Sequence, residues 1–247
     1  MQNRQIITVT GSDREDFLQN LVTNDVAGLK EGLVWTALLT PQGKYLADFF
    51  LVPDGDAILI DVAQDFAPGL MQRLSLYKLR ADVALSLSER GVATGPGPAP
   101  EGAFADPRNP ALGWRAYDGR ASEDMNTEAL RIEYLVPESG VELVANESYP
   151  LEMNFEALNG VDFRKGCYVG QEVTARMKHK TELKKGLARV SVDGDAPVGT
   201  EILTEDGKVA GTLFTHADGR GLAYLRFDRA TGPLRAGNAQ VLCKGAQ

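Results

Sequence analysis

The residues best suited to chemistry lie in one short segment, KGCYVGQE at residues 165–172. Gly166 and Gly170 flank a thiol and an aromatic ring, so the backbone there can turn tightly and approach a ligand closely. Positive charge at Lys165 favours the thiolate form of Cys167, which is the nucleophilic and metal-binding form. Free cysteines are more often small buried apolar residues, and that alternative stays open for Cys167.

A cationic stretch, RMKHKTELKK, follows at residues 176–185. It stands out in a chain with 26 Lys and Arg against 34 Asp and Glu, a formal net charge of −8. Such a stretch suits an anionic tail, a phosphate or RNA, although it lacks the interleaved aromatic residues that favour single-stranded RNA binding. A solvated connector is the alternative. The acidity of the whole chain disfavours a broad nucleic-acid surface, and no DNA partner is expected.

Two polar residues near the N-terminus are further candidates. Asp48 lies between Leu46 and Phe50 in an alternating strand, which predicts that these three side chains share one face. A carboxylate among apolar neighbours has a perturbed pKa or sits at the wet end of the sheet, and exposure is the default expectation. Asn24, within TNDV at 23–26, either contacts a ligand or belongs to an ordinary helix exit.

The scarcity of cysteine and histidine excludes several kinds of site. Cys167 and Cys243 are too few and too far apart for a disulfide framework or a zinc site, and they suit a reducing compartment. Only two histidines occur, which argues against a Ser-His-Asp hydrolase, and no metal site is predicted. The sequence shows neither a signal-peptide pattern nor an apolar run of about 18 residues, so we expect a cytoplasmic protein without membrane contact.

The elements that must position these residues fall into three segments. Residues 1–90 predict strand–helix–strand–strand–strand–helix–strand, which is close to a split βαβ, ferredoxin-like layer. Residues 91–185 begin with a Gly- and Pro-rich loop at 91–111, continue as a second α+β segment and carry the KGCYVGQE motif. Residues 186–247 alternate short strands with turns, which is typical of a small antiparallel β-barrel. The expected fold class is α+β with a C-terminal antiparallel barrel.

Several segments together resemble the folate-binding superfamily of the glycine cleavage T-protein, an aminomethyltransferase. The similar stretches lie along nearly the whole chain: residues 11–13, 17–19, 23–26, 39–44 with Asp48, 130–133, 150–152 and 206–211. Within that superfamily, KGCYVGQE is the hallmark of the YgfZ branch. Ala47 replaces the first residue of an Asp-Asp pair found in T-proteins, which weighs against glycine cleavage activity.

The resemblance implies ferredoxin-like folate-binding domains around a central cavity that takes tetrahydrofolate or a one-carbon derivative. It also implies a role in the assembly or repair of iron–sulfur proteins, with iron–sulfur client or assembly proteins as partners. Some members influence tRNA modification. The alternatives are a folate-dependent aminomethyltransferase, in which Asp48 stabilises charge developing on folate, and an RNA-binding accessory protein that uses the cationic stretch.

These considerations define the predicted site. The reactive residues are Cys167, Lys165 and Asp48. The folate contacts implied by the resemblance are Asn24, Asp48, Gly166, Tyr168, Gly170, Gln171, Glu172 and Arg176. Because an iron–sulfur cluster usually needs four thiolate-type ligands, one cysteine cannot hold it, and the other ligands must come from a partner or a second subunit. We expect Cys167 and Asp48 to open onto one shared cavity.

Overall fold

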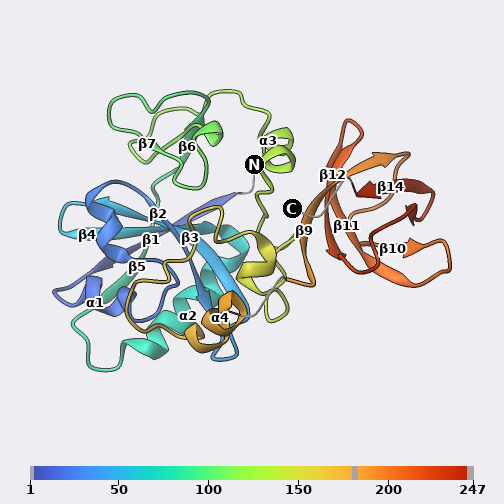
Figure 1. Cartoon of the computed structure of the whole chain (residues 1–247). Coiled ribbons are helices and arrows are strands. Elements are labelled where there is room, and N and C mark those ends of the chain that lie inside the picture. Colours follow the sequence, from blue (N-terminus) through green and yellow to red (C-terminus); the bar gives the residue numbers. More distant parts are fainter. Residues whose placement is uncertain (1–2, 180–182, 244–247) are drawn as a thin grey trace.

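The structure is a computed structural model that describes residues 3–179 and 183–243 (Figure 1). Its first segment is a five-stranded antiparallel sheet built from β1 (Arg4–Thr10), β2 (Val34–Leu39), β3 (Tyr45–Asp54), β4 (Ala57–Ala63) and β5 (Ala84–Ser88). The strands lie in the order β2-β3-β4-β1-β5, so β5 forms one edge. Alternating β-branched and aromatic residues in these strands explain why they pair, since such side chains pack well on a pleated surface.

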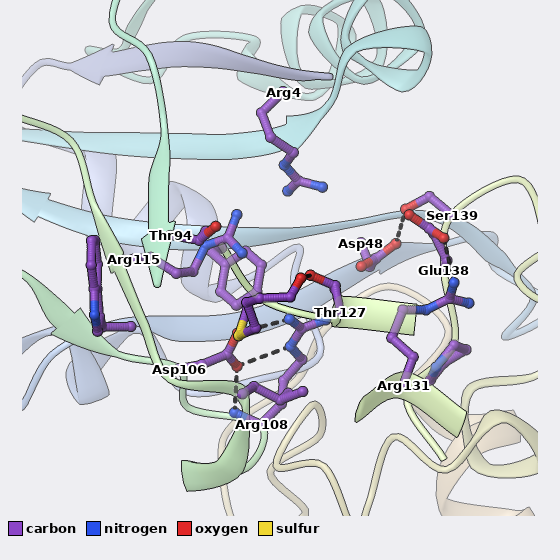
Figure 2. A pocket seen from close by; sticks show the side chains of 15 residues that line it. Arg4, Asp48, Thr94, Asp106, Arg108, Arg115, Thr127, Arg131, Glu138 and Ser139 are labelled. Atoms are coloured by element: carbon purple, nitrogen blue, oxygen red, sulfur yellow. Dashed lines mark hydrogen bonds and ion pairs between the residues drawn. The ribbon is translucent and has the colours of Figure 1, made fainter. Parts of the chain in front are cut away.

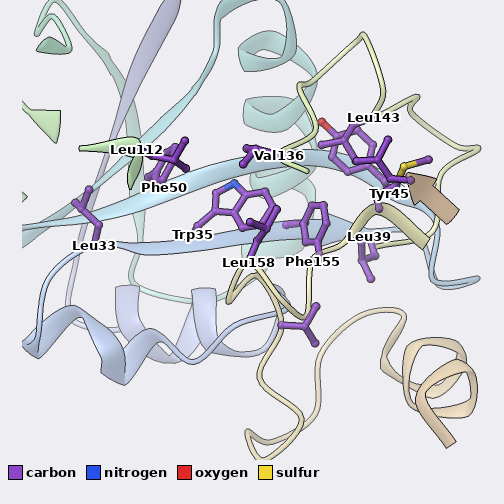
Figure 3. Packing of buried hydrophobic residues seen from close by; sticks show 14 of the residues in the cluster. Leu33, Trp35, Leu39, Tyr45, Phe50, Leu112, Val136, Leu143, Phe155 and Leu158 are labelled. Atoms are coloured by element: carbon purple, nitrogen blue, oxygen red, sulfur yellow. The ribbon is translucent and has the colours of Figure 1, made fainter. Parts of the chain in front are cut away.

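The sheet is covered on both faces. Helices α1 (Arg14–Gln19) and α2 (Ala67–Lys78) contribute to an apolar core with Phe49 and Leu51 of β3. The other face packs against later parts of the chain, and there the rings of Trp35 and Phe155 lie 4.3 Å apart (Figure 3).

A bulge changes the predicted register of β3. The pairing of β2 with β3 shifts between Leu38 and Leu39, which leaves Leu46 without a directly opposite partner. Asp48 and Phe50 therefore share a face as expected, but Leu46 belongs to the core on the opposite face. Because the side-chain period of a strand is two, one extra residue is enough to move a side chain to the other face.

The second segment holds a small sheet with the order β6-β8-β7 and two helices. Its elements are β6 (Ala93–Gly95), β7 (Phe104–Ala105), β8 (Trp114–Ala116), α3 (Thr127–Tyr134) and α4 (Gln171–His179). Among the described residues, four 3-10 turns lie in the connections of the first two segments. They are η1 (Val26–Lys30) and η2 (Gln64–Phe66) in the first, and η3 (Pro110–Leu112) and η4 (Pro150–Met153) in the second. The Gly- and Pro-rich stretch 91–111 is thus more than a loop, because it supplies β6 and β7. Strands of two or three residues are too short to show periodicity in sequence.

The third segment is a closed antiparallel barrel with the order β10-β11-β12-β9-β14-β13. Its strands are β9 (Lys185–Asp193), β10 (Thr200–Thr204), β11 (Val209–Ala217), β12 (Arg220–Arg226), β13 (Leu234–Ala236) and β14 (Ala239–Cys243). Figure 1 shows the barrel beside the N-terminal sheet, with α3 and the chain after it between them. The α+β class with a terminal antiparallel barrel is confirmed.

Within the described residues, no helix combines the length and the apolar character needed to cross a bilayer.

Candidate functional site

Lys165 anchors the motif loop to the segment that follows α1. Its ammonium donates hydrogen bonds to the backbone carbonyls of Gln19 at 2.8 Å, Val22 at 2.5 Å and Asn24 at 2.9 Å. An ammonium has three donors, so none remains for the thiol of Cys167. Burial lowers the pKa of Lys165 to about 8, which leaves it mostly protonated at pH 7. Lys165 therefore holds the loop in place, and the effect of its charge on the thiol stays a prediction.

Two glycines meet where the motif loop crosses the β2–β3 turn. Gly170 and Gly43 have φ angles of +85° and +74°. A Cβ on Gly170 would lie 2.6 Å from the carbonyl oxygen of Thr40, and one on Gly43 would lie 2.8 Å from the Cβ of Val173. Only glycine fits both positions. Gly166 is different, because a Cβ there would meet no atom within 4 Å.

Cys167 is exposed at the surface of this anchored loop. Glu172 and Arg176 of α4 are also exposed. Tyr168 is buried, and its ring centroid lies 5.2 Å from the ammonium nitrogen of Lys165. Because Cys167 is exposed, the alternative that it is a buried apolar residue is excluded, and a partner can reach its thiol.

Two further candidates, Asn24 and Gln171, lie within the framework around the motif loop. Asn24 donates from its side-chain amide to the backbone carbonyls of Trp35 at 2.9 Å and Asn159 at 2.6 Å. It thereby joins the end of the α1 segment to β2 and to the chain before the motif. Gln171 is half-buried at the start of α4.

Asp48 is buried, contrary to the default expectation of exposure. Its carboxylate accepts hydrogen bonds from the Trp35 indole at 3.0 Å, the Tyr45 hydroxyl at 2.8 Å and the Ser139 hydroxyl at 2.6 Å. An ionised carboxylate has about four acceptor positions, so one is left for a further donor. Burial, followed by the negative charge of Asp48, raises the pKa of Tyr45 well above its usual value, which keeps the phenol a donor.

Asp48 lines a hollow between β3, the small sheet and α3 (Figure 2). The hollow has a cavity volume of about 60 Å³. The lining includes the aromatic rings of Phe50 and Trp114 and four arginines, Arg4, Arg108, Arg115 and Arg131. Three of their guanidinium groups lie around Phe50, with centroid distances of 4.1 Å for Arg115, 4.9 Å for Arg108 and 5.9 Å for Arg4.

A buried carboxylate below the hollow pairs with two of these arginines. Asp61 is fully buried and accepts from Arg4 and Arg115, each at 2.6 Å, and from the hydroxyl of Tyr117 at 2.9 Å. Burial alone would raise the pKa of Asp61, but the charges of Arg115 and Arg4 outweigh it and the pKa is lowered. Burial and then the Asp61 charge raise the pKa of Tyr117 far above its usual range. This network fixes β8 against β1 and β4.

A second buried network joins the hollow to the barrel. Arg131 of α3 pairs with Glu138 at 2.5 Å and, more closely, with Glu142. Glu142 is fully buried and also accepts from the hydroxyl of Thr215 on β11 at 2.6 Å. Arg131 and Glu138 line the hollow, so the barrel is attached directly to its wall.

The structure separates the predicted residues into two places. Asp48 lines the hollow, and Cys167 is not among the residues that line it. The expectation of one shared cavity is therefore wrong. The reason is the loop geometry: Lys165 and Gly170 fix the motif to the α1 segment and the β2–β3 turn, and its thiol faces solvent.

The arginines of the hollow were not identified from the sequence. They come from three separate segments around Arg4, residues 108–115 and Arg131. The sequence feature that comes nearest to indicating these arginines is the segment 106–115, in which Asp106 and Arg108 are two residues apart. In the structure these two form a bidentate ion pair with N···O distances of 3.0 and 2.7 Å.

The described residues contain no group of three or more His, Cys, Asp or Glu placed to hold a metal ion. In the cationic stretch, Lys178 pairs with Glu156, and Lys184 and Lys185 are exposed. Lys180 lies outside the described residues.

Removing the anchor of the motif loop should loosen the loop. In Lys165→Met, the carbonyls of Gln19, Val22 and Asn24 lose their donor, and each buried unsatisfied carbonyl costs about 1–3 kcal/mol unless water replaces the donor. We expect a lower midpoint of urea unfolding and faster amide exchange in residues 19–24. Arg164→Met is the matched control, because that side chain is 94% exposed and should leave both measurements unchanged. Equal behaviour of the two variants would contradict the anchoring role.

Comparison with known proteins gives three kinds of likeness. Residues 184–244 match the family model "CAF17, C-terminal beta-barrel domain". The fold resembles the crystal structure of the glycine cleavage system aminomethyltransferase T from Bartonella henselae, with a TM-score of 0.75 over 98% of this chain and 83% of that one. At 13% identity, this likeness shows the fold alone.

The curated relatives are iron–sulfur assembly factors. The chain is 34% identical over 212 residues to "Iron-sulfur cluster assembly factor IBA57 homolog, mitochondrial" of Pyricularia oryzae, covering 75% of this chain and 54% of the relative. It is 28% identical to "Iron-sulfur cluster assembly factor IBA57, mitochondrial" of Mus musculus, covering 95% of this chain and 78% of the relative. The chain spans about half the length of the fungal relatives that it matches.

These findings confirm part of the sequence-based resemblance and correct the rest. The T-protein-like fold and the terminal barrel are confirmed. The curated relatives are named as IBA57 factors, and the barrel matches a CAF17 domain model, so the narrower assignment to YgfZ is not supported. The expected cytoplasmic location is contradicted, because the relatives are named as mitochondrial proteins.

Proposed function

Because this chain is similar to the IBA57 factors over most of its length and ends in a CAF17-type barrel, we propose that it acts in iron–sulfur cluster assembly, through the thiol of Cys167. The observation that carries the proposal is the exposed position of this thiol on a loop held by Lys165 and Gly170. A fixed backbone presents the sulfur in one place, and exposure allows a second protein to approach it.

A thiol in this position can bind iron but cannot enclose a cluster alone. The thiolate is the form of cysteine that binds metal. A cluster usually needs four ligands of this type, and the described residues offer no group of three or more to hold a metal. The remaining ligands therefore come from a partner, and this protein contributes one sulfur to a cluster shared across an interface.

The proposal is tested in cells that lack this protein. Enzymes that depend on iron–sulfur clusters should lose activity, and the intact chain should restore them, while an enzyme of the same compartment without a cluster should be unaffected. Unchanged activity of every cluster-dependent enzyme in the deletion strain would contradict an assembly role.

A second candidate function is the binding of a reduced folate in the hollow. In its favour, Asp48 keeps one acceptor position beside the rings of Phe50 and Trp114, and a pterin needs a flat apolar slot with an oriented carboxylate. The lining thus fits a pterin in chemical type. The hollow is too small for a pterin in this conformation, because its cavity volume of about 60 Å³ falls below the roughly 300–1,000 Å³ usual for ligand pockets. Side chains at the mouth would have to move.

Calorimetric titration with tetrahydrofolate tests this second function. Asp48→Asn should weaken binding by about 10- to 100-fold, because a hydrogen bond to a charged group contributes 1.5–3 kcal/mol. Asp56→Asn, at an exposed position on the β3–β4 turn, is the control and should bind like the wild type. If the wild-type titration showed no heat of binding, the proposed folate site would be contradicted. The proposed role of Cys167 would be unaffected. An influence on tRNA modification stays a prediction of the family resemblance.

A further inference from the structure

The C-terminal end of α2 exposes an unusual group of apolar side chains. Leu76 is 70% exposed, Tyr77 is 37% exposed and Leu79, just after the helix, is 88% exposed. A single exposed apolar residue is ordinary on a protein surface, but three large ones within four positions form a group that calls for an explanation. The stretch takes no part in the hollow or in the motif loop. We call Leu76, Tyr77 and Leu79, with the cations described next, the α2 patch.

Cations surround these apolar residues. Arg73, Lys78 and Arg80 lie within the same eight-residue stretch, and the two arginines are exposed. None of the three forms an ion pair within the described residues. This is notable in a chain with a net charge of −8, because the positive charge is concentrated beside the apolar side chains. A ligand seated here would cover apolar surface and face three guanidinium or ammonium groups.

Leu79 occupies a backbone conformation that suits glycine. Its φ and ψ are 46° and −108°, close to the first central position of a type II′ turn, where glycine is preferred. A leucine there carries steric strain, and its side chain gains no burial in exchange. Neither local conformation nor packing within this chain accounts for leucine at this position. Contact with another molecule would account for it, because burial of the side chain would then be gained on binding.

We propose that the α2 patch is a docking site for an acidic, amphipathic segment of a partner protein. Apolar residues of that segment cover Leu76, Tyr77 and Leu79, and its carboxylates face Arg73, Lys78 and Arg80. Lys78 already acts on the carboxylate of Asp82, but Arg73 and Arg80 are exposed, and carboxylates on the partner complement the positive charge of the patch. They also steer the encounter. The proposal does not depend on Cys167, so either can fail without the other.

Fluorescence polarisation with designed peptides tests the proposal. The probe is a labelled helical peptide with Leu on one face and Glu on the other, and the comparison peptide has Gln in place of Glu. The intact chain should bind the Glu peptide at least about tenfold more tightly than the Gln peptide, and this preference should fall as salt is raised. The double variant Leu76→Ser, Leu79→Gly should lose about tenfold or more in affinity. Leu242→Ser, on the barrel and 46% exposed, is the matched control and should bind normally.

A second variant separates binding from folding. Leu79→Gly should raise the melting temperature by about 2–4 °C, because glycine adopts this conformation without strain and 1 kcal/mol corresponds to such a shift in a chain of this size. The same variant should weaken binding of the Glu peptide. Equal binding of the Glu and Gln peptides, or unchanged binding in the double variant, would overturn the proposal. So would a concentration-dependent dimer in sedimentation that the double variant abolishes, because the patch would then be covered by a second copy of this chain.

Discussion

Replacing Cys167 by serine should abolish the activity of cluster-dependent enzymes in cells that rely on this protein, while the variant folds normally. The side chain is exposed, so its packing contributes little to stability. Serine has nearly the same size, but its hydroxyl stays protonated at neutral pH and is a poor ligand for iron in a cluster. We therefore expect activities close to those of the deletion strain, with an unchanged melting temperature.

The chain supplies its own control for this result. Cys243, at the end of β14, is partly buried, and burial raises the pKa of its thiol. Cys243→Ser should therefore support the cluster-dependent enzymes as the wild type does. If Cys167→Ser restored them fully, the thiol would have no role in the function proposed. Failure of both variants at equal protein levels would point to a requirement unrelated to the exposed sulfur.

Replacing Asp61 by asparagine should cause the largest loss of stability, about 3–5 kcal/mol, because removal of one partner leaves buried charge without compensation. Asp61 is fully buried, and its loss would leave Arg115 and Arg4 without their common carboxylate. The variant should unfold at a lower urea concentration than the wild type. Asp54→Asn is the matched control, because the pair of Asp54 with Arg90 lies at the surface and should contribute less than about 1 kcal/mol.

The same pair predicts a dependence on pH. The pKa of Asp61 in the folded protein lies below its ordinary value of 3.8, because Arg115 and Arg4 outweigh the opposing effect of burial. A carboxyl whose pKa is lower in the folded state contributes stability above its unfolded pKa and loses it as the pH falls. The difference in unfolding free energy between the wild type and Asp61→Asn should therefore be constant near neutrality and shrink below about pH 4. A difference that grows on acidification would contradict this pairing.

Much of the fold could be predicted because its signals are local. The strands β1 to β4 are rich in β-branched and aromatic residues, and Pro- or Gly-containing turns follow β1, β2 and β3, so their positions follow from the sequence. The bulge at Leu39 could not be predicted, because it depends on how two strands pair. The strands β6 and β7 could not be predicted for another reason, since two or three residues cannot display a period.

The candidate site was harder to predict because most of its contacts join distant segments. Cys167 was recognised from its motif, and its exposure agrees with a reactive thiol. The role of Lys165 could not be inferred, because its three acceptors lie more than 140 residues earlier in the chain. The burial of Asp48 was also unexpected, since its donors include Ser139, which lies 91 residues away.

The most direct test of the central claim is spectroscopic. The purified chain is mixed anaerobically with ferric iron, sulfide and the apo form of an enzyme that loses activity in the deletion strain, and visible circular dichroism is recorded. We expect a cluster spectrum that requires both proteins and is lost with Cys167→Ser but retained with Cys243→Ser. The same spectrum from the Cys167→Ser mixture would contradict a cluster shared through this sulfur.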